Sequence, residues 1–121
     1  MYHFEKLEIW QKAMSFVNGL YEATKYFPLD EKFGLINQIC RSAVSVPANI
    51  AEGSGRNSKK EFIQFLMIAR GSLYETVTLL MIAKKREYLG ESKYDELSKE
   101  IEAINMMLSK LISSCRSSLN E

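Results

Sequence analysis

Histidine and cysteine are scarce in this chain. His3 is the one histidine among 121 residues, so a serine or cysteine triad would have to use it. The two cysteines, Cys40 and Cys115, are far apart, and each follows an apolar helical pattern. This placement favours buried, reduced thiols over a disulfide or a metal site. We therefore expect no enzymatic activity, no metal and no cofactor.

Neither sign of charge dominates, and no long apolar run occurs. The 16 basic and 15 acidic residues leave a net charge of +1, so any binding to nucleic acid must come from a local patch. No run approaches about 18 consecutive apolar residues, and Glu5, Lys6 and Glu8 interrupt the region where a signal peptide needs an apolar stretch. We expect a cytoplasmic protein with no membrane partner and a single domain over residues 1–121.

Proline and glycine are also few, and they separate segments of helical periodicity. The chain has two prolines and six glycines. Between them, apolar residues recur three and four positions apart in four segments, at about residues 7–25, 30–52, 59–88 and 92–119. No strand pattern competes with these helices. The sequence predicts an all-α, up-down-up-down four-helix bundle, with tandem helical repeats as a weaker alternative.

The stretch SVPANIAEGSGR lies at the end of the second segment. Its apolar spacing continues through Pro47, which predicts one helix kinked at Pro47 rather than two short helices. Gly53 then provides a residue able to take positive φ at the helix end, and Gly55 adds a second flexible point. Ser58 and Glu61 fit a capping box that begins the third helix.

The third segment carries two apolar stripes. The stripe that we assign to the core comprises Phe62, Leu66, Ala69, Leu73, Leu80 and Ala83. The other stripe comprises Ile63, Met67, Tyr74 and Met81 and lies on a different face of the helix. A patch of this size is too large for comfortable exposure on a monomer, and identical subunits usually cover such a patch by cyclic closure. We therefore predict a homo-oligomer with these four residues in its interface.

Two charged residues lie in an otherwise apolar stretch, ARGSLYET. Arg70 and Glu75 need partners there, because charges are almost never buried unpaired. Candidates on the second helix are Arg41, Asn49 and Glu52. We predict pairs of Arg70 with Glu52 and of Arg41 with Glu75, in a polar network that fixes helix register rather than in a ligand site.

One ligand site is predicted at the turn before the third helix. Backbone N–H groups of Gly53 and Gly55 would be exposed there, close to the start of a helix. Arg56, Lys59 and Lys60 surround them, so the turn could bind an anion such as a phosphate. Repeated around a ring, these charges would form a basic rim able to follow a nucleic-acid backbone. The alternative is an ordinary solvated loop whose charges keep the surface soluble.

Three segments of the chain resemble a known family. They are FEKLEIWQKAM near the start, FPLDEKFGLINQICRSAVSVPANIAEGSGR in the middle and EFIQFLMIARGSLYET in the third helix. Together they resemble the four-helix-bundle proteins named for open reading frames inside intervening sequences of bacterial 23S ribosomal RNA genes. The chain departs from the family pattern at Cys40, where many relatives carry an arginine, and at Ser54, where an aromatic residue is common.

The resemblance implies a homopentamer of four-helix bundles, for which no reaction is established. A related bundle is the accessory protein of the reverse transcriptase of diversity-generating retroelements and binds nucleic acid, so analogy implies RNA or DNA as a ligand. Two function classes remain. One is a non-catalytic nucleic-acid-binding oligomer, an accessory factor to an intervening or mobile element. The other is a protein-interaction or structural scaffold with no nucleic-acid role. The basic patch and the family analogy favour the first.

Overall fold

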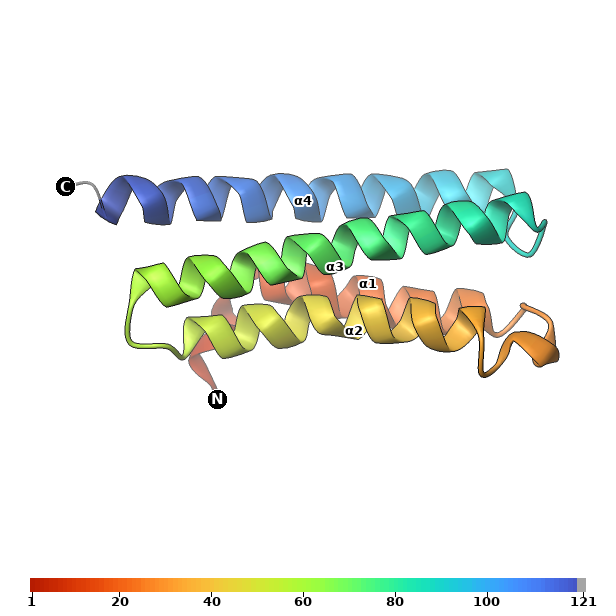
Figure 1. The fold of residues 1–121 in the computed structure, drawn as a ribbon, viewed down its shortest axis with the longest axis horizontal. Helices are drawn as coiled ribbons and strands as arrows, with labels where there is room; N and C mark the ends of the chain where they lie inside the picture. Colours follow the sequence, from red (N-terminus) through yellow and green to blue (C-terminus); the bar gives the residue numbers. More distant parts are fainter. Residues whose placement is uncertain (120–121) are drawn as a thin grey trace.

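The computed structural model describes residues 1–119, and within them every regular element is a helix (Figure 1). The four long helices are α1 (Glu8–Thr24), α2 (Leu35–Ser54), α3 (Lys59–Lys85) and α4 (Glu91–Leu119). Two short 3₁₀ turns precede α1 and α2, η1 at His3–Lys6 and η2 at Leu29–Glu31. The all-α prediction and its four segments are confirmed, with shifts of a few residues at most boundaries.

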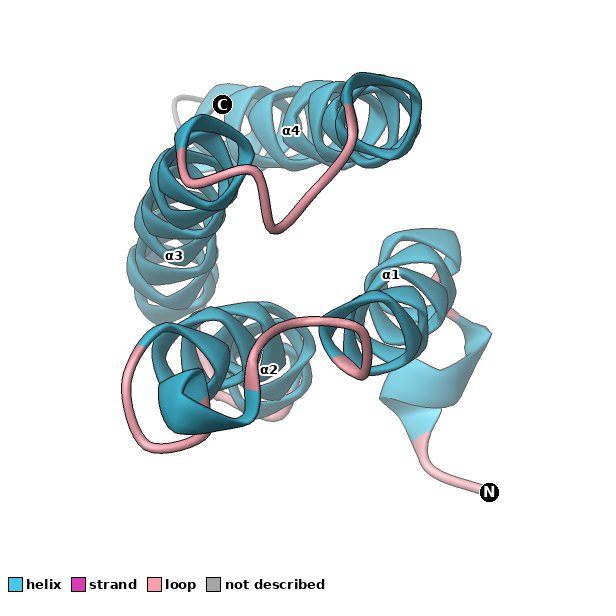
Figure 2. Ribbon diagram, turned by 90° about the vertical axis from the view of Figure 1, so that its right-hand side faces the viewer, coloured by secondary structure: helices cyan, strands magenta, loops and turns pink. Residues whose placement is uncertain are grey.

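The four helices surround one core in the order α1, α2, α3, α4 (Figure 2). Each helix packs against its neighbours in the chain, α4 also contacts α1, and α2 with α3 is the most closely packed pair. Short connections make successive helices antiparallel, as expected for an up-down bundle. The N-terminus, the α2–α3 turn and the C-terminal end of α4 therefore lie at one end of the molecule (Figure 1). We call this the terminal end.

The core consists of the helix faces that the apolar spacing predicts. Its largest fully buried side chains include Phe16, Leu20, Ile39, Ile50, Leu66, Leu73, Leu80, Leu97, Ile104, Leu108 and Ile112. Burial of each such side chain contributes about 1.5–3 kcal/mol to folding. Both cysteines are free and buried, as predicted. Burial raises the pKa of the Cys40 thiol, against a smaller opposing effect of its contact with Thr24, so the thiol stays protonated at neutral pH.

The helix α2 passes through Pro47 without interruption, which confirms that one helix spans this stretch. The kink at Pro47 stays a prediction. The role expected of Gly53 was wrong, because no glycine of the described chain has positive φ and Gly53 is buried within α2. A Cβ at Gly53 would lie 2.6 Å from Phe65 Cβ and 2.9 Å from Phe62 Cδ1. Gly53 therefore allows α2 and α3 to approach closely, which is a packing requirement and not a turn requirement.

The start of α2 differs from the prediction. The helix begins at Leu35 rather than near residue 30, and Phe33, which lies within the predicted segment 30–52, is 88% exposed. The reason is local: Glu31 Oε1 accepts a hydrogen bond from the Leu35 N–H at 3.2 Å, so the carboxylate caps a helix that starts after it. A side chain at Gly34 would meet that carboxylate, since a Cβ there lies 2.8 Å from Glu31 Oε1.

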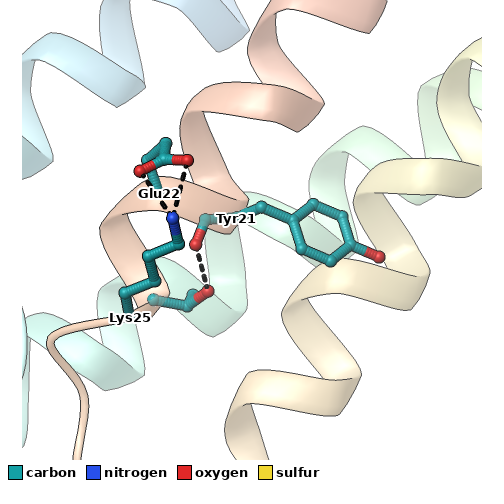
Figure 3. A network of polar contacts seen from close by, with 4 residues as sticks. Tyr21, Glu22 and Lys25 are labelled. Carbon is teal, nitrogen blue, oxygen red and sulfur yellow. Dashed lines mark hydrogen bonds and ion pairs between the residues drawn. The ribbon is translucent and has the colours of Figure 1, made fainter.

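Polar contacts join neighbouring residues at the C-terminal end of α1 (Figure 3). Lys25 Nζ lies 2.9 Å and 3.0 Å from the two carboxylate oxygens of Glu22, and the Thr24 hydroxyl donates to the Tyr21 carbonyl at 3.2 Å. Both charged side chains are exposed, and a surface ion pair of this kind contributes less than about 1 kcal/mol. The position of α1 is therefore set by its buried apolar face.

Candidate assembly and nucleic-acid surfaces

Helix α3 presents an apolar surface to solvent, as the second stripe predicts. Met67, Tyr74 and Met81 are 42%, 54% and 51% exposed. They are seven residues apart, so they share one face of the helix. Ile63 is a correction to the predicted interface, because it is only 8% exposed and belongs to the core. Ile63 lies four residues before Met67, so the two side chains point in directions about 40° apart around the helix axis. This rotation turns Ile63 toward the core.

Two residues that the sequence analysis did not select widen this surface. Ile68 and Ile82 are 52% and 45% exposed. Gly71 lies between them along α3, and a Cβ added there would meet nothing within 4 Å. We call Met67, Ile68, Gly71, Tyr74, Met81 and Ile82 the α3 face. Ile68 and Ile82 were missed because they fit neither three-and-four spaced stripe, although their separation of 14 residues is two heptads.

The two apolar faces make α3 unusually hydrophobic. By length and composition alone α3 could cross a membrane, with a mean hydropathy of 1.4 over its most apolar window. Within that window, 33% of the residues are buried inside the bundle. A core helix with a second apolar face gives the same values, so the hydropathy of α3 is weak evidence for a membrane span.

The predicted pairing of Arg70 with Glu52 and of Arg41 with Glu75 was wrong. Glu52 pairs instead with Arg56, four residues later on its own turn, at 2.9 Å. Half-buried Arg70 faces α4, where its Nη1 lies 3.4 Å from Ser109 Oγ. Arg41 and Glu75 are both exposed, and neither takes part in an ion pair within residues 1–119.

A network of hydroxyl groups joins α2 to α3 in place of the predicted charges. Ser42 Oγ lies 2.8 Å from Thr76 Oγ1, and Ser45 Oγ lies 2.8 Å from Ser72 Oγ. Asn49 is the one predicted member that joins it, because its Nδ2 donates to Ser45 Oγ at 2.9 Å. The sequence signal was present, since the polar residues of each helix recur at helical spacing. Spacing alone does not separate these hydroxyl groups from solvated ones, so the sequence did not single them out.

The network forms the floor of a shallow polar groove. Its volume is about 370 Å³, and its lining residues are Asn37, Gln38, Arg41, Ser42, Ser45, Ser72 and Glu75. The groove lining contains both Arg41 and Glu75, but these two residues do not form the predicted ion pair. A second groove, of about 310 Å³ between α1 and α4, contains Glu100. Burial, and next the charge of Glu96, raise the pKa of Glu100, while Lys93 and Lys12 oppose the shift.

The predicted anion site at the α2–α3 turn has fewer free donors than expected. The N–H of Gly55 donates to the Glu52 carbonyl at 3.2 Å, and the N–H of Arg56 donates to the Gly53 carbonyl at 3.1 Å. The turn satisfies these N–H groups itself, so the predicted backbone nest for a phosphate was wrong. The N-cap of α3 is as expected, because Ser58 Oγ accepts from the Glu61 N–H at 3.1 Å.

The cations around the turn are exposed but differ in their contacts. Arg56 pairs with Glu52, and its guanidinium carbon lies 4.8 Å from the centre of the Phe65 ring. Lys59 Nζ donates to Ser118 Oγ of α4. Exposed Arg116, also on α4, reaches Met67 Sδ at 3.4 Å and adds a fourth cation to Arg56, Lys59 and exposed Lys60 near the terminal end. Sequence spacing could not place Arg116 there, because it comes from another helix.

The fold and surfaces of the described residues define a class of protein. It is an all-helical up-down four-helix bundle with an exposed apolar helix face, and residues 1–119 contain no group of three or more His, Cys, Asp or Glu side chains that could hold a metal ion. The chain belongs to the 23S rRNA-intervening sequence protein family, whose profile matches residues 5–110. The resemblance found in the sequence is thereby confirmed.

One solved structure shows the same fold in a relative. It is a protein of unknown function from the S23 ribosomal protein family of Bacteroides thetaiotaomicron, 28% identical in sequence. The two superpose with a TM-score of 0.80, over 86% of this chain and 97% of that one. None of the curated proteins matches the chain.

Proposed function

We propose that this protein is a non-catalytic helical bundle that assembles with copies of itself and binds RNA or DNA through the basic terminal end of the assembly. In this proposal it is an accessory factor to an intervening or mobile element. The observation that carries the proposal is the α3 face, where five large apolar side chains are 42–54% exposed around an open glycine. Large apolar patches on soluble proteins usually mark interaction sites.

Self-assembly is the simplest way to cover the α3 face. Each copy carries the same face, so assembly removes the exposed apolar area from water without a second gene product. The family resemblance implies five subunits arranged in a ring. Cyclic symmetry would also repeat every other surface of the chain at equal intervals around the ring.

Nucleic-acid binding is supported by the cations at the terminal end. Arg56, Lys59, Lys60 and Arg116 are exposed there, against exposed Glu52 and Glu61. A monomer would make few phosphate contacts. A ring would multiply them, and the affinity would fall steeply with salt because each contact releases counterions.

Self-assembly is tested by sedimentation equilibrium at micromolar concentration. The wild type should have a multiple of the monomer mass, whereas Met67→Glu/Met81→Glu should be a monomer because it places two charges on the α3 face. Met106→Glu is the matched control, since Met106 is 61% exposed on α4, outside the α3 face, and this variant should assemble normally. A monomeric wild type would refute self-assembly.

Nucleic-acid binding is tested by mobility shift with structured RNA, single-stranded DNA and duplex DNA at two salt concentrations. Arg56→Glu/Lys59→Glu/Lys60→Glu should abolish binding and leave assembly intact. Lys84→Glu/Lys85→Glu/Arg86→Glu, at the opposite end of α3, makes the same change in net charge and should retain binding. If the wild type binds none of the three nucleic acids at low salt, the scaffold alternative replaces this part of the proposal.

A further inference from the structure

The connection between α1 and α2 lies at the end of the bundle opposite the terminal end (Figure 1). It exposes three large apolar side chains. Tyr26, Leu29 and Phe33 are 86%, 88% and 88% exposed. Single exposed apolar residues are ordinary on protein surfaces. Three with such exposure within eight residues form a patch that calls for a partner. We call these three residues the tip.

The tip is held by a fixed backbone and is not a loose loop. Buried Phe27 packs its ring against Tyr88, with ring centroids 5.7 Å apart. The Glu31 carboxylate accepts hydrogen bonds from the Tyr88 hydroxyl and the Leu35 N–H, both at 3.2 Å. The connection is therefore anchored both to α3–α4 and to the start of α2 while its largest side chains project outward. A surface preorganised in this way loses little conformational entropy when it binds.

We infer that the tip of one copy docks on the α3 face of a second copy. This inference rests on the self-assembly proposed above and specifies which surfaces meet. The two patches have matching chemistry, since both are apolar and exposed within the chain that carries them. The α3 face also has open space at Gly71, where no atom lies within 4 Å of an added Cβ, so a projecting side chain can approach the helix backbone.

Each patch has charges of both signs beside it, Asp30 and Lys32 at the tip and Arg41 and Glu75 along the groove next to the α3 face. Lys32 lies next to the tip, with its Nζ 5.6 Å from the centre of the Phe33 ring. Exposed Glu75 is one helical turn after Gly71, and no ion pair in the described part of the chain uses either side chain. Docking of the tip near Gly71 would bring Lys32 and Glu75 together. Opposite charges placed in this way fix the register of an interface.

Contact between the tip and the α3 face is compatible with a ring. The tip and the α3 face are different surfaces, so in a ring each copy can use one surface to bind the preceding copy and the other to bind the next. Contacts of this kind close into a ring when the rotation permits. A symmetric pairing of one α3 face with another would instead leave every tip exposed to water.

The test is a complementation experiment by sedimentation equilibrium. The tip variant is Leu29→Glu/Phe33→Glu, and the face variant is Ile68→Glu/Ile82→Glu; all four positions are exposed, and circular dichroism checks that both variants fold. Each variant alone should be a monomer, with association weakened at least tenfold. An equimolar mixture should contain a dimer, because the intact tip of the face variant can bind the intact face of the tip variant.

The outcomes separate this inference from the proposed function. A tip variant that assembles like the wild type would overturn the inference and leave self-assembly standing, with the tip free for some other partner. A mixture that stays monomeric would also overturn it. A monomeric wild type would overturn self-assembly itself.

A charge exchange gives a second measurement that leaves the apolar residues intact. Lys32→Glu and Glu75→Lys should each weaken assembly, and the double variant should restore it. Glu102→Lys changes another exposed carboxylate, on α4, and should not rescue Lys32→Glu. If Glu75→Lys and Glu102→Lys restored the assembly of Lys32→Glu equally, net charge alone would explain the effect. The proposed pairing of Lys32 with Glu75 would then be overturned.

Discussion

Gly53 and Gly19 both lie inside helices, yet their surroundings give them opposite roles. A Cβ at Gly53 would overlap the side chains of Phe62 and Phe65, whereas a Cβ at Gly19 would meet nothing within 4 Å. Glycine in a helix interior costs about 0.5–1 kcal/mol relative to alanine because of its backbone entropy. At Gly53 that cost is offset by the close packing of α2 on α3, and at Gly19 the described structure shows no compensation.

The first prediction compares these two positions. Gly53→Ala should lower the free energy of unfolding by about 1–3 kcal/mol, because the extra methyl group forces α2 and α3 apart. Gly19→Ala is the matched control and should raise it by about 0.5–1 kcal/mol. Urea denaturation of both variants measures the difference. A Gly53→Ala variant as stable as Gly19→Ala would contradict the packing role.

Glu87 is the one residue with positive φ in the described chain, at 64°. It follows α3, and the Tyr88 N–H donates to the Ala83 carbonyl at 3.0 Å, which is the bonding pattern of a Schellman helix end. Glycine usually occupies such a position because an L-residue with a Cβ is strained there.

The second prediction follows from this strain. Glu87→Gly should raise the free energy of unfolding by about 0.5–1 kcal/mol, since the relief of strain exceeds the added entropy of the unfolded chain. Glu87→Ala keeps the Cβ and should bring no such gain. Thermal unfolding of the two variants decides between strain and loss of the carboxylate, because equal stabilisation by both would implicate the charge.

At the scale of elements, the α2–α3 pair combines small residues with hydroxyl groups at its contact. Ser42 and Thr76 face each other across this contact, and each hydroxyl also lies within hydrogen-bond distance of a carbonyl oxygen of its own helix, at 3.1 Å and 2.8 Å. Each hydroxyl has a single hydrogen, so one of the two donates to the other hydroxyl while that second hydroxyl donates to its own helix carbonyl. Loss of one hydroxyl therefore does not leave the other without a partner. The pair contributes to stability through the hydrogen bond between α2 and α3, which also helps to fix the register of the two helices.

The third prediction is a double-mutant cycle on this pair. Ser42→Ala and Thr76→Val should show a coupling energy of about 0.5–1.5 kcal/mol in urea denaturation, the range of a net hydrogen bond. Thr78→Val is the control partner, because exposed Thr78 donates only to the Tyr74 carbonyl of its own helix. Ser42→Ala and Thr78→Val should be additive. Additivity in both cycles would show that the interhelical bond contributes nothing.

At the scale of the whole molecule, two exposed apolar patches distinguish this chain from a four-helix bundle that exposes no large apolar patch as a monomer. The α3 face and the tip lie outside the core that stabilises the monomer. Stability of the native protein should then include a contribution from association, which depends on protein concentration.

The fourth prediction concerns this dependence. Each tenfold increase in protein concentration should raise the wild-type Tm by about 3–6 °C. The reason is that only folded chains associate, so a higher concentration shifts the unfolding equilibrium toward the folded state. The Tm of Met67→Glu/Met81→Glu should not change with concentration, and that of Met106→Glu should change as the wild type does. Calorimetry over a hundredfold range of concentration measures all three. A constant wild-type Tm would contradict self-assembly.

The sequence alone determined the helices, their order and most of their buried faces. Helical periodicity is a local property, so the spacing of Leu66, Leu73 and Leu80 is enough to assign them to the core. The N-cap at Ser58 was predictable for the same reason, since its bonding partner lies three residues away. The exposed stripe of Met67, Tyr74 and Met81 also follows from spacing.

Tertiary structure decided everything that depends on how one helix is rotated against another. A rotation of about 40° separates buried Ile63 from exposed Met67, and no spacing rule fixes where the core ends on a helix surface. Arg70 meets Ser109 because it faces α4, and Glu52 pairs within its own turn with Arg56 instead of reaching across to α3. Periodicity assigns residues to faces, whereas partners across a bundle depend on distances between segments remote in the chain.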